Sequence, residues 1–129
     1  MPDPLDGYWV VDIDDGVLGL RRTDKRSTDM PAFLRSFDGI YVALAPSAPA
    51  DTDLLIDLRN TVGRNDPEFE TQLVERRREL FRRFKRSCVL VKTVIGRMQV
   101  QRHVDEDGFA GRVRVFDDES AARNWLRET

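Results

Sequence analysis

Short strand-like runs and longer helix-like stretches follow one another along the hydrophobic pattern of this chain. Two runs rich in apolar residues, Gly7–Ile13 and Val17–Arg22, flank a polar turn at residues 14–16 that ends in glycine. Glycine supplies the positive φ of a tight turn, so these runs predict a β-hairpin. Two continuous apolar runs, Leu54–Leu58 and Cys88–Lys92, are typical of central strands covered on both faces.

The first helix-like stretch has apolar residues at helical spacing between a cap-rich start and a proline. This pattern predicts a helix from about Asp29 to Ala45. Gly39 weakens such a helix by roughly 1 kcal/mol relative to alanine. The alternative is a short helix that ends at this glycine, followed by a strand over residues 40–45. Helical periodicity favours the longer helix.

Three more helices are expected further along the chain. The second begins at Asp66 and Pro67, residue types suited to a helix start. The third is capped by Thr93 and runs to about Val104, and the fourth follows the acidic pair at residues 117–118. The packing face of the fourth helix comprises four residues: Ala121, Ala122, Trp125 and Leu126.

An alternating run at Arg112–Phe116 predicts one more strand, either parallel or at an edge. The resulting order is β-β-α-β-α-β-α-β-α. Strands that alternate with helices favour right-handed crossovers and a largely parallel sheet with helices packed against it. The sequence therefore predicts an α/β fold in one domain over residues 1–129, with a mixed, largely parallel sheet, an N-terminal hairpin and about four helices.

Composition supports a globular chain: of 129 residues, 40% are hydrophobic and 34% are charged. No apolar run approaches the roughly 20 residues that span a bilayer, and the N-terminus lacks the features of a secretory signal. A single cysteine, Cys88, excludes an internal disulfide. We therefore expect a cytoplasmic protein with this thiol buried in a strand.

The net charge of −2 conceals an asymmetry. Residues 1–58 carry a balance of −6, whereas residues 59–114 carry +6. A basic middle segment could attract an acidic partner, phosphate or an anionic surface; the alternative is a solvated helix face balanced by acidic neighbours in the fold. Phe81 and Phe84 lie among the arginines but fit a buried stripe better than a base-stacking platform, so no nucleic-acid partner is expected.

The order of elements, with LLIDLR at residues 54–59 before a helix and RVRVFDDESAARNWL at residues 112–126, resembles the STAS fold. STAS is the sulphate-transporter and anti-sigma-factor-antagonist domain, and the nearest branch is the bacterial SpoIIAA-like group. The resemblance implies a non-enzymatic regulatory module. It also implies that the loop after the central strand, and the helix that this loop opens, contact a protein partner.

The matching loop here, Arg59–Asp66, departs from the family pattern. In anti-sigma-factor antagonists it carries Asp-Ser-Ser-Gly, with a serine that a partner kinase phosphorylates. This loop has no serine, and its only hydroxyl belongs to Thr61. Phosphorylation of Thr61 is therefore the weakest of the hypotheses for this loop.

The loops Arg59–Asp66 and Thr93–Arg97 should lie side by side, because both leave the carboxyl ends of neighbouring strands. Arginines and helix N-termini at such an edge favour phosphate or carboxylate. The alternative is that Asp66 and Thr93 cap their helices while the arginines pair with nearby acids such as Glu68 and Glu70. The candidate partner-binding or anion-binding residues are Arg59, Thr61, Arg64, Asn65, Asp66, Thr93, Arg97 and Arg102.

Other chemistry finds little support in the residues. One histidine, His103, and a distant cysteine make no zinc site, and no catalytic constellation, metal site or cofactor motif is expected. Homodimerisation could use the basic helix or an exposed strand edge. A second function hypothesis is a small-ligand protein that binds an anion at the same edge or a lipid in an apolar pocket. The aromatic residues that would line this pocket, or simply form the core, are Phe33, Phe37, Tyr41, Phe69, Phe81 and Phe84.

Overall fold

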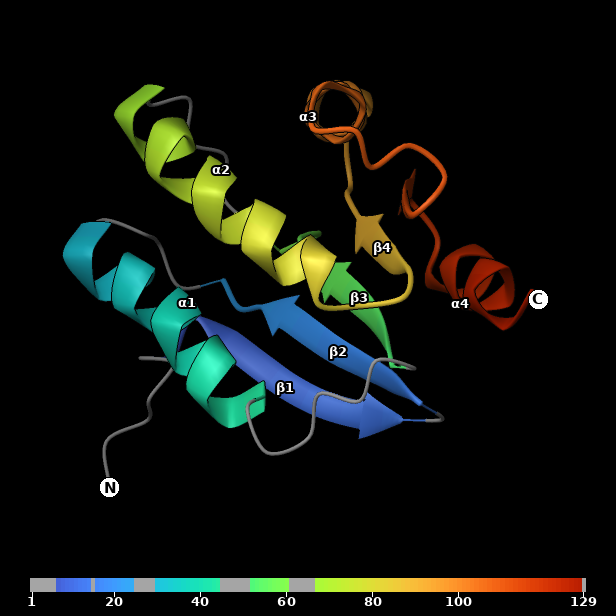
Figure 1. Cartoon of the computed structure of the whole chain (residues 1–129), viewed down its shortest axis with the longest axis horizontal. Helices are drawn as coiled ribbons and strands as arrows, with labels where there is room; N and C mark the ends of the chain where they lie inside the picture. Colours follow the sequence, from blue (N-terminus) through green and yellow to red (C-terminus); the bar gives the residue numbers. More distant parts are fainter. Residues whose placement is uncertain (1–6, 15, 25–29, 45–51, 61–66, 129) are drawn as a thin grey trace.

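The computed structural model describes residues 7–14, 16–24, 30–44, 52–60 and 67–128. These residues form one five-stranded sheet with helices on both faces (Figure 1). The strands are β1 (Trp9–Asp14), β2 (Val17–Arg22), β3 (Asp53–Asp57), β4 (Ser87–Leu90) and β5 (Val113–Phe116). The helices are α1 (Met30–Leu44), α2 (Pro67–Arg82), α3 (Val94–Glu106) and α4 (Glu119–Arg127).

The strands lie in the sheet in their order along the chain. β1 is antiparallel to β2, and β2 to β5 are parallel to one another, which confirms the predicted mixed sheet. Gly16 has a φ of 75° in the turn between β1 and β2, so the glycine there has the predicted backbone role. α1 continues through Gly39 to Leu44, so the longer of the two predicted helices is correct.

Two hydrophobic clusters lie on opposite faces of the sheet. The first face is covered by α1, α2 and α3, with α1 and α2 side by side (Figure 1). The second face is covered by α4, which packs against β4 and β5. Alternation along the strands explains the division, because successive side chains point to opposite faces: Leu54 and Ile56 join the first cluster, and Leu55 joins the second.

The predicted aromatic residues with described side chains lie in the core of the first face. Phe33 and Phe37 pack edge to face with ring centroids 5.5 Å apart, and Trp9 packs on Phe37 at 5.3 Å. Trp9 Nε1 also donates a hydrogen bond to the buried Ser36 hydroxyl, at 3.0 Å. Phe81 and Phe84 are likewise buried. The side chains of Tyr41 and Phe69 lie outside the described part, and the lipid pocket stays a prediction.

The predicted packing face of the last helix is wrong at one position. Ala122, Trp125 and Leu126 are buried as predicted, but Ala121 is exposed. Residues spaced by three and four share one face of a helix, and Ala121 lies about 100° around the axis from Ala122. The buried face of α4 is therefore narrower than predicted.

Candidate functional site

The carboxyl ends of the four parallel strands meet at one edge of the sheet, where ligands and partners of α/β folds commonly bind. Two features lie at this edge. The first is a charged network on the second face, between β2, β3 and α4. The second is an apolar surface on α3, the helix that follows β4.

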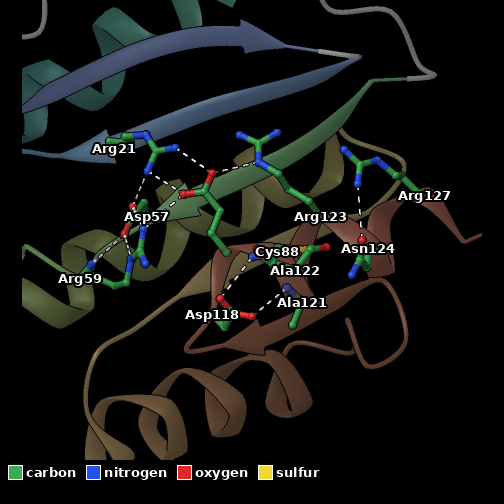
Figure 2. A network of polar contacts seen from close by, with 12 residues as sticks. Arg21, Asp57, Arg59, Cys88, Asp118, Ala121, Ala122, Arg123, Asn124 and Arg127 are labelled. Carbon is green, nitrogen blue, oxygen red and sulfur yellow. Dashed lines mark hydrogen bonds and ion pairs between the residues drawn. The ribbon is translucent and has the colours of Figure 1, made fainter.

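Figure 2 shows the charged side chains of Arg21, Asp57 and Arg59 converging at the ends of β2 and β3. Asp57 accepts a hydrogen bond from Arg21 Nη1 at 2.7 Å, and it accepts from Nε and Nη2 of Arg59 at 3.0 and 2.8 Å. Glu119 accepts from Arg21 Nη2 at 3.0 Å, from Arg59 Nη2 at 3.2 Å and from Arg123 Nε at 2.9 Å. We call these five residues the arginine network; three arginines and two acids leave it one positive charge.

The sheet register and the start of α4 position the arginine network. Arg21 and Asp57 are register partners in the parallel β2–β3 pair, so their side chains share one face. Glu119 is the first residue of α4. The Asp118 carboxylate caps this helix by accepting from two backbone N–H groups in its first turn. The network therefore joins the ends of two strands to the start of a helix that follows much later in the chain.

Hydrogen bonds to arginine dominate the electrostatics of Glu119. The hydrogen bond from Arg21 holds the pKa of this carboxyl at about 2, against the opposing effect of burial. Burial raises the pKa of Asp57, but the hydrogen bonds and charge of Arg59 and the charge of Arg21 outweigh it and leave the pKa below its ordinary value. Both acids are therefore ionised at neutral pH.

The absence of a side chain at Gly19 leaves room for the carboxylate of Asp12, which lies on β1 next to the arginine network. A Cβ built on Gly19 would clash with Oδ1 of Asp12, its register partner on β1. The Asp12 charge also contributes to the raised pKa of Arg21, after the larger effect of the hydrogen bond to Glu119. A side chain at position 19 would force this carboxylate to move.

The first half of α3 exposes large apolar side chains. Val94 is 74% exposed, Ile95 is 70% exposed and Met98 is 67% exposed. We call these three residues the α3 patch. Lys92 and Arg97, beside the patch in sequence, are also exposed, and no acidic residue occurs between Lys92 and Val104. The α3 patch is therefore an apolar surface with basic neighbours.

The second half of α3 is attached to the rest of the fold. Val104 is the buried residue of this helix. Arg78 of α2 donates from Nε and Nη2 to Oδ1 of Asp107, the C-cap residue, at 2.9 and 2.7 Å. This contact supports the alternative stated for the basic segment, in which the positive charges of α2 are balanced by acidic neighbours in the fold.

The structure places four of the eight candidate residues and leaves the other four outside the described part: Thr61, Arg64, Asn65 and Asp66. Arg59 belongs to the arginine network. The Thr93 hydroxyl accepts from the Gly96 N–H at 3.0 Å and so caps α3 as expected. Arg97 and Arg102 are exposed on α3. Among the described residues, no hydrogen bond or ion pair joins Arg59 to any of these three.

Sequence reasoning missed Arg21, Asp57 and Glu119 as site residues. One signal was present: Asp57 is the single charged residue in the predicted apolar run Leu54–Leu58, and a buried carboxylate requires a partner. Its side chain is 6% exposed and its partners are Arg21 and Arg59. The involvement of Glu119 had no comparable signal, because its position in sequence is that of an ordinary acid at a helix start.

Cys88 is a buried core thiol, as predicted. Its Sγ donates to the Ala122 carbonyl, and burial raises its pKa to about 12. Within the described ranges, no group of three or more His, Cys, Asp or Glu side chains is arranged to hold a metal ion. No helix in the same ranges is both long and apolar enough to cross a membrane.

Comparison with known proteins identifies the fold. No family model matches the sequence, and no curated protein matches it either. The crystal structure of an uncharacterized protein of the DUF3478 family, with a SpoIIAA-like fold, from Shewanella loihica PV-4 is similar to this chain. The match covers 92% of this chain and 91% of that one, with 14% sequence identity and a TM-score of 0.62. The chain therefore has the SpoIIAA-like fold that its sequence predicted.

Proposed function

We propose that this chain is a non-enzymatic regulatory module that docks a protein partner through the α3 patch. The observation that carries the proposal is the exposure of three large apolar side chains on one half of a helix, at the carboxyl edge of the sheet. Apolar side chains gathered on a surface mark contact sites more often than scattered ones do. The patch lies on the helix that carries three of the predicted partner-binding or anion-binding residues: Thr93 at its cap, Arg97 and Arg102.

The charged network supports docking over anion binding. Each arginine of the network donates to Asp57 or Glu119, so binding an anion there would require breaking charge-assisted hydrogen bonds. Arg59, which follows β3 by two residues, is held in place by these bonds.

Photo-crosslinking from the α3 patch tests this proposal. A photoreactive amino acid replaces Met98 in the full chain, and a control chain carries it at the exposed Gln99. After irradiation in cells of the source organism, we expect a discrete protein adduct from position 98. Val94→Ser with Ile95→Ser should abolish this adduct, whereas Gln101→Ala should leave it intact.

Two results would contradict docking of a protein. One is the same set of adducts from positions 98 and 99, which would indicate random collision. The other is an adduct of lipid mass at position 98 without a protein adduct, which would favour the lipid alternative. Circular dichroism of each variant confirms that the fold is retained.

A further inference from the structure

The outer edge of β1 lies at the opposite end of the sheet from β5 and carries backbone groups that face outward. In an antiparallel ladder, hydrogen-bonded pairs alternate with pairs that are not bonded. The Thr23 N–H donates to the Tyr8 carbonyl at 2.9 Å, and the register sets Val10 opposite Arg21 and Asp12 opposite Gly19. Even-numbered residues of β1 therefore bond to β2, and the N–H and C=O groups of residues 9, 11 and 13 point outward.

The side chains of this strand add to the exposed edge. Val10 is 53% exposed and Ile13 is 66% exposed, and these are two of the five large apolar side chains exposed in the described ranges. Natural edge strands are commonly protected by charged side chains, above all lysine, by proline or by a bulge. β1 has the sequence WVVDID and a continuous register with β2, so it has no lysine, proline or bulge, and its only charges are those of Asp12 and Asp14.

We propose that β1 pairs antiparallel with β1 of a second copy of this chain and joins two sheets into one. This surface is distinct from the α3 patch, and the proposal does not depend on the proposed function. A two-fold axis perpendicular to the sheet, passing beside Val11, relates the two strands. Equivalent faces of the two sheets are then continuous, because an antiparallel pair related in this way keeps opposite residues on the same face.

Hydrogen bonding and charge select one register for this pairing. With Val11 opposite Val11 of the second copy, residues 9, 11 and 13 all form hydrogen-bonded pairs. A shift of one strand by two residues toward the C-terminus would set Asp12 opposite Asp12, and like charges directly opposite are destabilising. A shift by two toward the N-terminus would take Ile13 out of its pairing with Trp9. The register centred on Val11 is therefore favoured.

No like charges lie directly opposite each other in this register. Asp12 of the second copy lies opposite Val10, and Val10 lies opposite Arg21 of its own chain. The acid of one copy and the arginine of the other thus occupy one row across the second face, separated by the apolar Val10. The row occurs twice in the dimer, because the axis repeats it.

Charge substitution at Val10 tests the proposal, because this exposed position lies opposite Asp12 of the second copy. Sedimentation equilibrium of the wild-type chain should show a reversible dimer. Val10→Lys should lower the dimer Kd roughly threefold to tenfold by adding two cross-strand ion pairs, and Val10→Asp should raise it by a similar factor. Val10→Thr serves as the uncharged control, and near-wild-type circular dichroism shows that each variant folds.

Hydrogen exchange locates the contact. Amides of Trp9, Val11 and Ile13 should gain protection as protein concentration rises, while those of Val10 and Asp12, already bonded to β2, should change little. Three results would overturn the proposal. They are a monomer at every soluble concentration, a dimer whose Kd moves in the same direction or not at all in both charged variants, and unchanged exchange at residues 9, 11 and 13.

Discussion

Two helices of this fold follow parallel strands in the same way yet differ in how they are held. α3 begins with the Thr93 cap and α4 with the Asp118 cap. α4 buries three residues and has polar contacts at both of its ends, with Arg21 of β2 at the start and with Arg86, the residue before β4, at the end. α3 buries Val104 and is attached near its C-terminus, while its first half exposes the α3 patch.

The contact at the end of α4 completes this contrast. Arg86 donates to the carbonyls of Trp125 and Leu126 at 3.2 and 2.5 Å, and its guanidinium stacks on the Trp125 ring at 5.2 Å. A cation at a helix C-terminus is favoured by the helix dipole. The comparison teaches that α4 serves the stability of the fold, whereas the first half of α3 contributes surface rather than core.

The largest expected effect separates the apolar residues of the two helices. Trp125→Ala removes a buried ring that contacts Phe116 and should lower the free energy of unfolding by about 3–5 kcal/mol. Met98→Ala removes a side chain that is 67% exposed, so it should change the free energy of unfolding by less than about 0.5 kcal/mol. Urea unfolding measures both. Equal losses in the two variants would contradict the contrast between α3 and α4.

The next effect concerns the attachment of α4 at its start. Glu119→Gln leaves three arginines around one remaining acid and should lower the free energy of unfolding at neutral pH by about 2 kcal/mol. Glu119→Asp, which keeps the charge, should lose less. Equal losses in the Gln and Asp variants would show that side-chain length matters there and that charge does not.

The same residue predicts how stability depends on pH. The pKa of Glu119 is about 2 in the fold and near 4.5 without it, so its stabilisation is complete above about pH 4.5 and is lost as pH falls toward 2. The free energy of unfolding of the wild-type chain should therefore decline through this range, and more steeply than that of Glu119→Gln. Urea unfolding at a series of pH values measures the difference, and parallel curves would refute the assignment.

A smaller effect is expected at the attached end of α3. Asp107→Asn weakens the paired hydrogen bonds from Arg78 and should lower the free energy of unfolding by less than Glu119→Gln does, because the Arg78 side chain is exposed to solvent. Amide exchange should become faster over residues 94–106 and stay unchanged in α4. Faster exchange in both helices would indicate a global loss of stability instead of a local release of α3.

The smallest effect is expected at the α3 patch itself. Val94→Ser with Ile95→Ser should change the free energy of unfolding by about 0.5 kcal/mol or less, because both side chains are mostly exposed and the helix propensities are similar. Thermal or urea unfolding checks this value. A loss of several times this size would place the patch in the core and remove the basis for proposing a docking site.

The sequence predicted the order of strands and helices because that order rests on local periodicity and turn chemistry. The hairpin at Gly16 and the continuation of α1 through Gly39 are examples. The arginine network could not be predicted in the same way. It depends on which strands become neighbours and on their register, so Arg21 meets Asp57 across 36 residues and Glu119 across 98.

The α3 patch shows a second limit of sequence patterns. Ile95 and Met98 have the spacing of a packing face, yet this part of the helix faces solvent. Periodicity identifies a helix but does not state which of its faces meets the sheet. That choice is made by the tertiary contacts of Val104 and Asp107 at the other end of α3.

The contact between Arg21 and Glu119 also bears on how the chain reaches its fold. It joins residues 98 positions apart, so the second face of the sheet is completed only after residues 119–127 have been synthesised. Until then, Leu55, Cys88 and Leu90 have no cover from α4. Non-local contacts of this kind slow folding, and an uncovered apolar sheet face favours aggregation. The nascent chain should therefore be most dependent on chaperones just before α4 emerges from the ribosome.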